Sequence, residues 1–390
     1  MYAIILKRLR PRIRLVPALA LMGLAFLAVA PLPGESQSGA SASFAGPVAS
    51  ASASETVRAQ PAPAPAAVDP AFDLCAKEGT VSVAGAGSVP IWGFALKPDG
   101  VPCSDESVVA ELPGPPLIVE EDDAVTVNLH NELSVHVSLA FPQVKILPDT
   151  LGAAPGATKT YTFTADRPGT FLYEAGTVAQ ESGLGPSTCS DGTDNDSDSF
   201  ADADDPECTS AGNSRIQVAM GLFGPLVIRP NDGASFAYND LDTEFDVEAV
   251  LVLSEIDPDL NDDPGGFDMD YYNPKYWLIN GEAYPDTSDI MADPADRVLF
   301  RYLNASLSQH VMSLGGFYQT VIAGDAYPLS FAYQVVSLTV SSGQTFDAIG
   351  SVPGDAPSGT MYPLYSANQH VTNGSAFPGG MLTFVTVDGP

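Results

Sequence analysis

Short apolar segments separated by turns are the feature of this sequence that most limits its fold. In VTVNLHN (125–131), the apolar residues Val125, Val127 and Leu129 alternate with polar ones, which is typical of a half-buried strand with His130 on its polar face. Further strand-like segments occur at 160–165, 221–230, 248–256, 297–304, 335–340 and 381–387. No long segment shows the 3.6-residue period of a helix. Many short strands at close spacing predict an all-β chain built from sandwiches or barrels.

The length and the charge of the chain restrict its organisation and its partners. Its 390 residues suit two ordinary domains or three small ones, and a hydrophobic content of 45% excludes a wholly disordered chain. The net charge at pH 7 is −32. Because nucleic acids and anionic membranes are also negatively charged, we expect the protein to bind neither.

The first thirty residues differ in composition from the rest of the chain. Basic residues from Lys7 to Arg14 precede an apolar stretch at 15–30, which is short for a bilayer span and ends in an A-x-A-like pattern at Ala28 and Ala30. This predicts a secretory signal peptide over 1–30, with an uncleaved anchor as the alternative. We therefore expect a protein that is secreted, on the cell surface or in the periplasm. Residues 31–70 are mostly Ala, Ser, Pro and Gly and predict a disordered linker.

The remaining sequence divides into two predicted domains, 71–236 and 245–390, with a polar stretch between them and an acidic insert at 187–212 in the first. The chain has four cysteines, and an even number in an exported protein favours disulfides. Three pairings are formally open, and proximity in the sequence favours Cys75 with Cys103 and Cys189 with Cys208.

Several longer segments resemble the multicopper oxidase family. In the first domain these are PGPPLIVEEDDAVTVNLHNEL (113–133), GATKTYTFTADRPGTFLYEAG (156–176) and MGLFGPLVIRP (220–230). In the second they are YWLINGEAYPD (276–286), RYLNASLSQHVMSLGGFYQTVIAGDAYPL (301–329) and GGMLTFVTV (379–387). The resemblance implies two Greek-key, cupredoxin-like (plastocyanin-like) β-sandwich domains and, for a family member with its ligands, a copper oxidoreductase. Two-domain relatives often form trimers, so a homotrimer is also implied.

The resemblance also indicates where the copper ligands should lie. The family holds a trinuclear centre with four His-x-His pairs, and a blue copper with two His, one Cys thiolate and a weak axial Met. The trinuclear positions are occupied here by Ala140, Pro142, Glu174, Gly176, Ser313, Gly315, His370 and Thr372. The blue-copper positions are occupied by His310, Val371, Ala376 and Met381. Only His310, His370 and Met381 keep a suitable donor, and the four histidines of the whole chain are fewer than the trinuclear centre needs.

We therefore predict a cupredoxin scaffold without oxidase chemistry and without a functional copper centre, acting as a binding or structural module. Two alternatives stay open. One is a true copper oxidoreductase of the family. The other is weak copper binding by His310, Met312 and Met381. Glu174, which replaces a family ligand, is interpreted as a buried, hydrogen-bonded carboxylate, and a cation ligand or an acid is the alternative. His130 and His136 are interpreted as surface histidines.

The acidic insert contains CSDGTDNDSDSFADADDPEC (189–208), where acidic residues recur at regular offsets. The ligand offsets of a calcium loop would fall on Asp194, Asp196, Asp198, Asp202 and Asp205, together with the carbonyl of Phe200. The loop departs from an EF-hand because Ser199 replaces the turn glycine and Asp205 replaces the bidentate glutamate. A divalent ion would relieve the repulsion between the carboxylates. The insert therefore predicts calcium binding, with a solvated acidic loop as the alternative.

Overall fold

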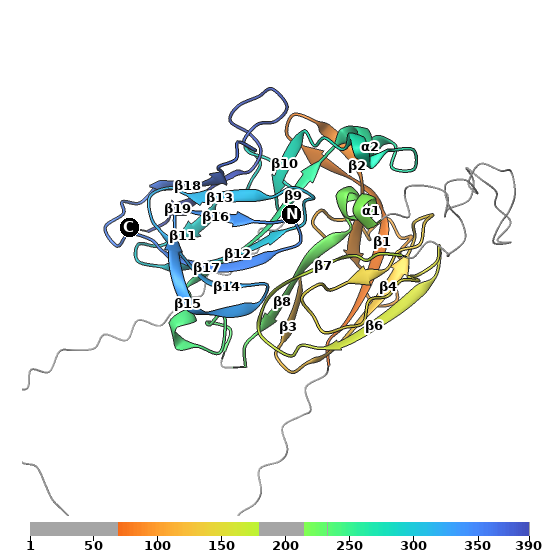
Figure 1. Cartoon of the computed structure of the whole chain (residues 1–390), viewed down its shortest axis with the longest axis horizontal. Helices are drawn as coiled ribbons and strands as arrows, with labels where there is room; N and C mark the ends of the chain where they lie inside the picture. Colours follow the sequence, from red (N-terminus) through yellow and green to blue (C-terminus); the bar gives the residue numbers. More distant parts are fainter. Residues whose placement is uncertain (1–68, 179–213, 232, 390) are drawn as a thin grey trace, which may run out of the picture. The chain divides into compact units, whose positions relative to one another are not determined.

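Four β-sheets make up most of the folded chain (Figure 1). The structure is a computed structural model that describes residues 69–178, 214–231 and 233–389. The predicted all-β fold is confirmed, since the α-helices in these ranges are only α1 (Ser214–Met220) and α2 (Pro258–Asp262). Two 3₁₀ turns, η3 (Leu241–Thr243) and η4 (Met269–Tyr271), complete the helical segments there. No helix in the described ranges is long and apolar enough to span a membrane.

Strands β1 to β8 form the first sandwich from two four-stranded sheets. The first sheet has the strand order β2 (Gly87–Leu96), β1 (Ala71–Val83), β4 (Ala124–Asn131) and β6 (Thr158–Thr164). The second has the order β3 (Leu117–Glu120), β8 (Phe223–Arg229), β7 (Gly169–Ala175) and β5 (Leu139–Ala140). The predicted alternation in β4 is confirmed, because Val125, Val127 and Leu129 enter the core shared by the two sheets. His130 lies on the opposite, partly exposed face.

Strands β9 to β19 form the second sandwich. Its six-stranded sheet has the order β10 (Tyr276–Ile279), β9 (Val247–Ile256), β12 (Arg297–Asn304), β17 (Thr345–Ser351), β14 (Gln319–Gly324) and β15 (Tyr327–Val335). Its five-stranded sheet has the order β11 (Ile290–Ala292), β19 (Leu382–Val387), β18 (Met361–Ser366), β13 (His310–Leu314) and β16 (Ser337–Val340). The segment 335–340, predicted as one strand, is instead the end of β15 and the whole of β16. The chain passes from one sheet to the other at Val336, so this one apolar segment contributes to a strand in each sheet of the second sandwich.

The six-stranded sheet contacts both hydrophobic cores. On β9, Ala249 and Leu251 pack in the core of the second sandwich, whereas Val252 packs in the core of the first. On β12, Leu303 also joins the core of the first sandwich. A strand that is covered on both faces needs apolar residues on both, which explains why 248–256 is a continuous apolar run rather than an alternating one.

A buried network of charges joins the two sandwiches. Arg301 on β12 is fully buried, and it donates through Nε to Glu248 Oε1 on β9 at 2.6 Å and through Nη1 to Thr170 Oγ1 on β7 at 2.9 Å. Arg229 on β8 donates to both oxygens of the same Glu248 carboxylate, at 2.6 and 2.5 Å. Burial opposes the ionisation of Glu248, but the charge of Arg301 and the hydrogen bond from Arg229 outweigh it and lower the pKa of this carboxyl well below its usual range.

The second carboxylate of the network is Asp347 on β17. It lies 3.4 Å from Arg301 Nη1, and it accepts hydrogen bonds from Thr170 Oγ1 and Tyr238 Oη, both at 2.5 Å. Tyr238 lies in the connection between the two sandwiches. The charges of Arg229 and Arg301 therefore balance those of Glu248 and Asp347. Hydrogen bonds from both sandwiches and from the connection complete the network.

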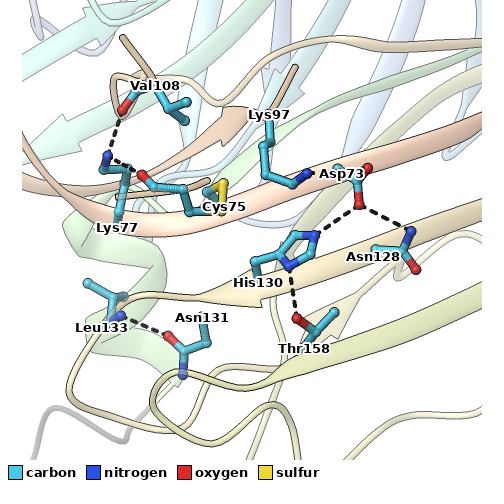
Figure 2. Close-up of a disulfide and its surroundings, with 11 residues drawn as sticks. Asp73, Cys75, Lys77, Lys97, Val108, Asn128, His130, Asn131, Leu133 and Thr158 are labelled. Atoms are coloured by element: carbon cyan, nitrogen blue, oxygen red, sulfur yellow. Dashed lines mark hydrogen bonds and ion pairs between the residues drawn. A yellow bond between two sulfur atoms is a disulfide. The ribbon is translucent and has the colours of Figure 1, made fainter. Parts of the chain in front are cut away.

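One disulfide fixes the loop that follows β2. Cys75 on β1 is bonded to Cys103, which confirms the predicted pair, and both residues are buried. Figure 2 shows Lys77 beside this bridge, where its Nζ donates to the carbonyls of Cys103 and Val108 at 2.6 Å each. Residues 1–68, with the predicted signal peptide and most of the linker, lie outside the described residues. So does the other predicted pair, Cys189 and Cys208.

The charge network predicts that Arg301 cannot be replaced without a large loss of stability. We expect Arg301→Met to lower the free energy of unfolding by about 3–5 kcal/mol, because it leaves two carboxylates buried without their main counter-charge. The matched control is Arg297→Met on the same strand, where the side chain is partly exposed and donates to the Asp242 carbonyl. Its cost should stay below about 1 kcal/mol. Denaturant unfolding measures both values, and equal losses in the two variants would contradict a structural role for the network.

Candidate functional site

Two of the histidines predicted as residual copper positions lie against each other in the second sandwich. His310 is the first residue of β13 and is fully buried, and His370 lies in the connection between β18 and β19. Their Nδ1 atoms are 3.0 Å apart. Trp277 on β10 stacks on His370 with a ring-centroid distance of 4.6 Å and an interplanar angle of 3°. On the other side, His310 Nε2 lies 2.7 Å from Ser306 Oγ. Trp277 therefore holds the imidazole of His370, and the Ser306 hydroxyl holds that of His310.

Both imidazoles are neutral at pH 7. Burial is the main reason, and the neighbouring His370 adds to it, so that the pKa of His310 is lowered to about 3. Burial also lowers the pKa of His370. A neutral pair joined Nδ1 to Nδ1 shares one proton, with one ring donating and the other accepting. Neutral imidazole is also the form that binds metals.

The predicted axial ligand, Met381, is connected to this pair through the backbone. Its N–H donates to the carbonyl of His370 at 2.8 Å, and its side chain is fully buried in the core that also contains Met312. Val371, at the predicted position of the family thiolate, is buried, and Ala376, at the predicted position of the second imidazole, is exposed. The two cysteines of the described part of the chain are both in the disulfide. The donors that these residues supply are thus imidazole and thioether without thiolate, a set that does not fit a blue-copper centre.

Five of the residues at the predicted trinuclear positions lie in closely packed surroundings. Ala140 on β5 and Glu174 on β7 are direct cross-strand partners. A Cβ at Gly176 would lie 2.6 Å from Ser138 Oγ, and a Cβ at Gly315 would lie 3.0 Å from Pro363 Cγ. Ser313 accepts a hydrogen bond from Ser337 Oγ at 2.9 Å. At both glycines an imidazole would require neighbouring atoms to move.

No group of three or more His, Cys, Asp or Glu side chains in the described ranges is arranged to hold a metal ion. His130 instead lies between Asp73 Oδ1, at 2.9 Å from its Nε2, and Thr158 Oγ1, at 2.8 Å from its Nδ1 (Figure 2). His136 Nδ1 lies 3.2 Å from the carbonyl of Leu151. Both side chains belong to partly exposed hydrogen-bonded surfaces. The predicted calcium ligands Asp194, Asp196, Asp198, Phe200, Asp202 and Asp205 lie outside the described residues.

Glu174 differs from the expectation of a hydrogen-bonded carboxylate. Within the described ranges, no group donates a hydrogen bond to its side chain, although the strands β5 and β8 pair with β7 on both sides of it. Burial raises the pKa of Glu174 to about 7. The sequence could not reveal this, because whether a carboxylate finds a donor depends on side chains from other strands. Glu174 is thus a carboxyl group, at a predicted ligand position, that can change its charge near neutral pH.

This raised pKa predicts an unusual dependence of stability on pH. Between pH 4.5 and about 7 the folded state holds a proton on Glu174 that the unfolded state releases, so the contribution of this group to stability falls as the pH rises through that window. The loss should reach at most about 3 kcal/mol. In Glu174→Gln it should disappear, whereas Glu132→Gln, at an exposed carboxylate, should leave the dependence unchanged. Unfolding free energies at pH 5 and pH 8 test this, and a Glu174→Gln curve parallel to that of the wild type would rule it out.

Comparison with known proteins identifies the relatives of this chain. Residues 104–191 and 259–388 each match the multicopper oxidase family, and together they cover more than half of the chain. No curated protein sequence gives a match. Among solved structures, the blue copper oxidase from Nitrosomonas europaea is similar with 19% identity and a TM-score of 0.60, over 82% of this chain and 86% of that one.

Two further structures have the same likeness. The multicopper oxidase mgLAC has 22% identity and a TM-score of 0.62, covering 83% of this chain and 87% of its own. The copper nitrite reductase from Nitrosomonas europaea has 20% identity and a TM-score of 0.56, covering 82% of this chain and 93% of its own. At these identities the likeness concerns the fold, which is all-β and cupredoxin-like. With both family matches in sequence order on this fold, the chain belongs to the multicopper oxidase family.

Proposed function

We propose that this protein is an exported member of the multicopper oxidase family that has lost most of its copper ligands and works as a non-catalytic binding or structural module. The observation that carries the proposal is the donor set at the family's ligand positions. Of those positions, only His310, His370 and Met381 offer a nitrogen or sulfur donor suited to copper. Alanine, valine, glycine and proline side chains have no lone pair to give a metal ion.

The packing around these positions supports the same conclusion. Gly176 and Gly315 stand where the family has imidazoles, and the space next to each is taken by Ser138 and Pro363. A site that had lost one ligand by a recent substitution would keep a hollow beside it. Here neighbouring atoms occupy that volume, as expected for a core that has been repacked to native density.

Export is supported by the disulfide as well as by the predicted signal peptide. Cys75–Cys103 is buried under the first sheet, and disulfides persist in compartments outside the reducing cytosol. An exported chain with a large negative charge stays soluble through mutual repulsion. These properties suit a module that works in the periplasm, on the cell surface or in the medium.

A copper-binding oxidoreductase is the second candidate, and the pair of histidines is the observation in its favour. Two neutral imidazoles with Nδ1 atoms 3.0 Å apart could both approach one ion. The backbone N–H of Met381 donates to the carbonyl of His370 beside them. Such a two-histidine site has no thiolate to set a redox potential in the blue-copper range. It would therefore supply weak copper binding and not the chemistry of the family.

Metal content distinguishes the two candidates. We expect the natively purified protein to contain far less than one copper per chain and to lack the intense visible absorption of a copper–thiolate bond. Added Cu²⁺ should bind weakly, and His370→Ala should abolish this binding whereas His136→Ala, at a partly exposed histidine elsewhere, should not. Stoichiometric copper together with blue colour in the purified protein would overturn the non-catalytic function.

The acidic insert is proposed to bind calcium and to stabilise the region between the predicted Cys189 and Cys208. The support is the spacing of its aspartates and the absence of any Lys or Arg in 189–208. Calcium loops of extracellular type bind with dissociation constants of about 10⁻⁴–10⁻³ M, so occupancy would follow the calcium content of the medium.

A calcium site predicts ligand-dependent thermal stability. Calcium well above its dissociation constant should raise the melting temperature relative to a chelator, because it binds only the folded loop. The double variant Asp194→Asn/Asp196→Asn should melt at one temperature in both conditions, and Asp259→Asn, outside the insert, should behave as the wild type. Identical melting curves of the wild type with calcium and with chelator would remove the calcium proposal.

A further inference from the structure

A cavity of about 650 Å³ lies where the two sandwiches and the connection between them meet. Its floor is formed by residues of β12, β14, β15 and β17, on the face of the six-stranded sheet that points away from the core of the second sandwich. Residues 238–243 of the connection line one wall, and Arg167 and Pro168 of the first sandwich complete it. Ligand pockets have volumes of roughly 300–1,000 Å³ and often lie at domain interfaces.

A bulge in β15 opens the apolar part of this cavity. The register between β14 and β15 shifts between Val321 and Ala323, so residues 329–332 lie opposite Ile322 alone. A segment of several residues opposite one departs from the ladder. Three residues of the bulge line the cavity beside the side chains of β14 and β17: Leu329, Ser330 and Ala332.

The charged side chains that are open to a ligand gather at one end of the cavity. Arg297 and Ser351 are cross-strand partners there, at the ends of β12 and β17. Arg297 Nη2 donates to the carbonyl of Asp242, and no acceptor in the described ranges is bonded to its Nε or Nη1. The carboxylates of Asp240 and Asp242 line the same cavity, and the one printed bond to either is from the Asp242 N–H to Asp240 Oδ1, at 3.0 Å. Free N–H donors and free carboxylate oxygens therefore lie next to each other.

The second guanidinium of the cavity, that of Arg167, is already engaged. Its Nε donates to the carbonyl of Ala326 and its Nη1 to Asp166, both at 3.2 Å, and its Nη2 donates to the carbonyl of Gln143. Its face lies 4.2 Å from the ring centroid of Tyr327. Arg167 thus forms a fixed wall, and Arg297 is the guanidinium in this cavity that has donors left for a ligand.

We propose that this cavity binds a free amino acid with a large apolar side chain. Arg297 binds its carboxylate, because a guanidinium with free N–H donors suits the planar anion. Asp240 and Asp242 accept hydrogen bonds from its ammonium group. The apolar side chain lies over Ile322 and Ile349, which continue the floor from the charged end toward the bulge.

The charges of the lining favour a zwitterion. The whole chain has 48 Asp and Glu against 16 Lys and Arg, yet the cavity is lined by two arginines and two aspartates. An organic acid would place its charge against both carboxylates, and an amine would place its charge against Arg297. A neutral ligand would cover these charges without pairing them, which costs free energy. An α-amino acid carries both charges on one carbon, as the adjacent groups at this end of the cavity require.

Calorimetric titration of the full chain with L-phenylalanine tests the proposal. We expect one-to-one binding. Hydrocinnamate lacks the ammonium group and phenethylamine lacks the carboxylate, and each should bind about 10-fold more weakly or worse, because one charged group of the cavity then loses its partner. Glycine keeps both charges without the apolar body, and it should also bind at least about 10-fold more weakly.

Variants of the charged end assign each group to its partner. Arg297→Met should fold normally, since this side chain is partly exposed, and it should bind phenylalanine no better than phenethylamine. The double variant Asp240→Asn/Asp242→Asn should bind phenylalanine and hydrocinnamate equally, while asparagine still caps η3. Lys275→Met is the matched control, because it removes a cation outside the cavity, and it should keep the affinity of the wild type.

Several results would overturn the proposal. They are a wild type that binds no standard amino acid, an analogue that binds as tightly as phenylalanine, or an Arg297→Met variant that keeps the affinity of the wild type. The proposal names a ligand for the binding function proposed above, but it does not rest on the loss of copper ligands. Metal content tests that function separately, so the failure of one proposal leaves the other in place.

Discussion

The buried positive charge of Arg301 has to be balanced by carboxylates inside the protein, and this requirement fixes how the two sandwiches pack against each other. Its guanidinium is fully buried on β12, so Glu248 and Asp347 must approach it from the neighbouring strands and Thr170 from the other sandwich. Shifting a strand by one residue would turn these side chains to the opposite face and leave charges unpaired in the core. The network therefore specifies one register for the six-stranded sheet and one packing arrangement of that sheet against the first sandwich.

The charge network shares no residue with the predicted copper positions, so the junction between the two sandwiches does not require a bound metal. The charge network lies between the sheets, whereas some of the predicted ligand positions, such as His370 and Gly176, lie in connections between strands. Function resides in such sites rather than in the fold that carries them. At such positions, small residues in place of imidazoles would remove metal donors without removing apolar contacts from the cores. His310 is fully buried, and the half-buried His370 stacks on Trp277, so packing holds both histidines.

The sequence by itself determined the all-β class, the alternating strand β4 and the apolar runs of β9 and β12, because the period of apolar residues is a local property. It favoured the pair Cys75–Cys103 by proximity and left the other pairings open. Through the family resemblance it also predicts that His310 and His370 are among the few donors at the family's ligand positions. Only the tertiary structure decided that the two Nδ1 atoms meet, that Glu174 finds no donor among the described residues, and that Arg301 lies between two carboxylates. It also decided that the apolar strand β15 lies at an edge and not in a core. An apolar strand has the same composition at an edge and in a core. Its exposure depends on which strands pair beside it, and that pairing is set by contacts between residues far apart in the chain.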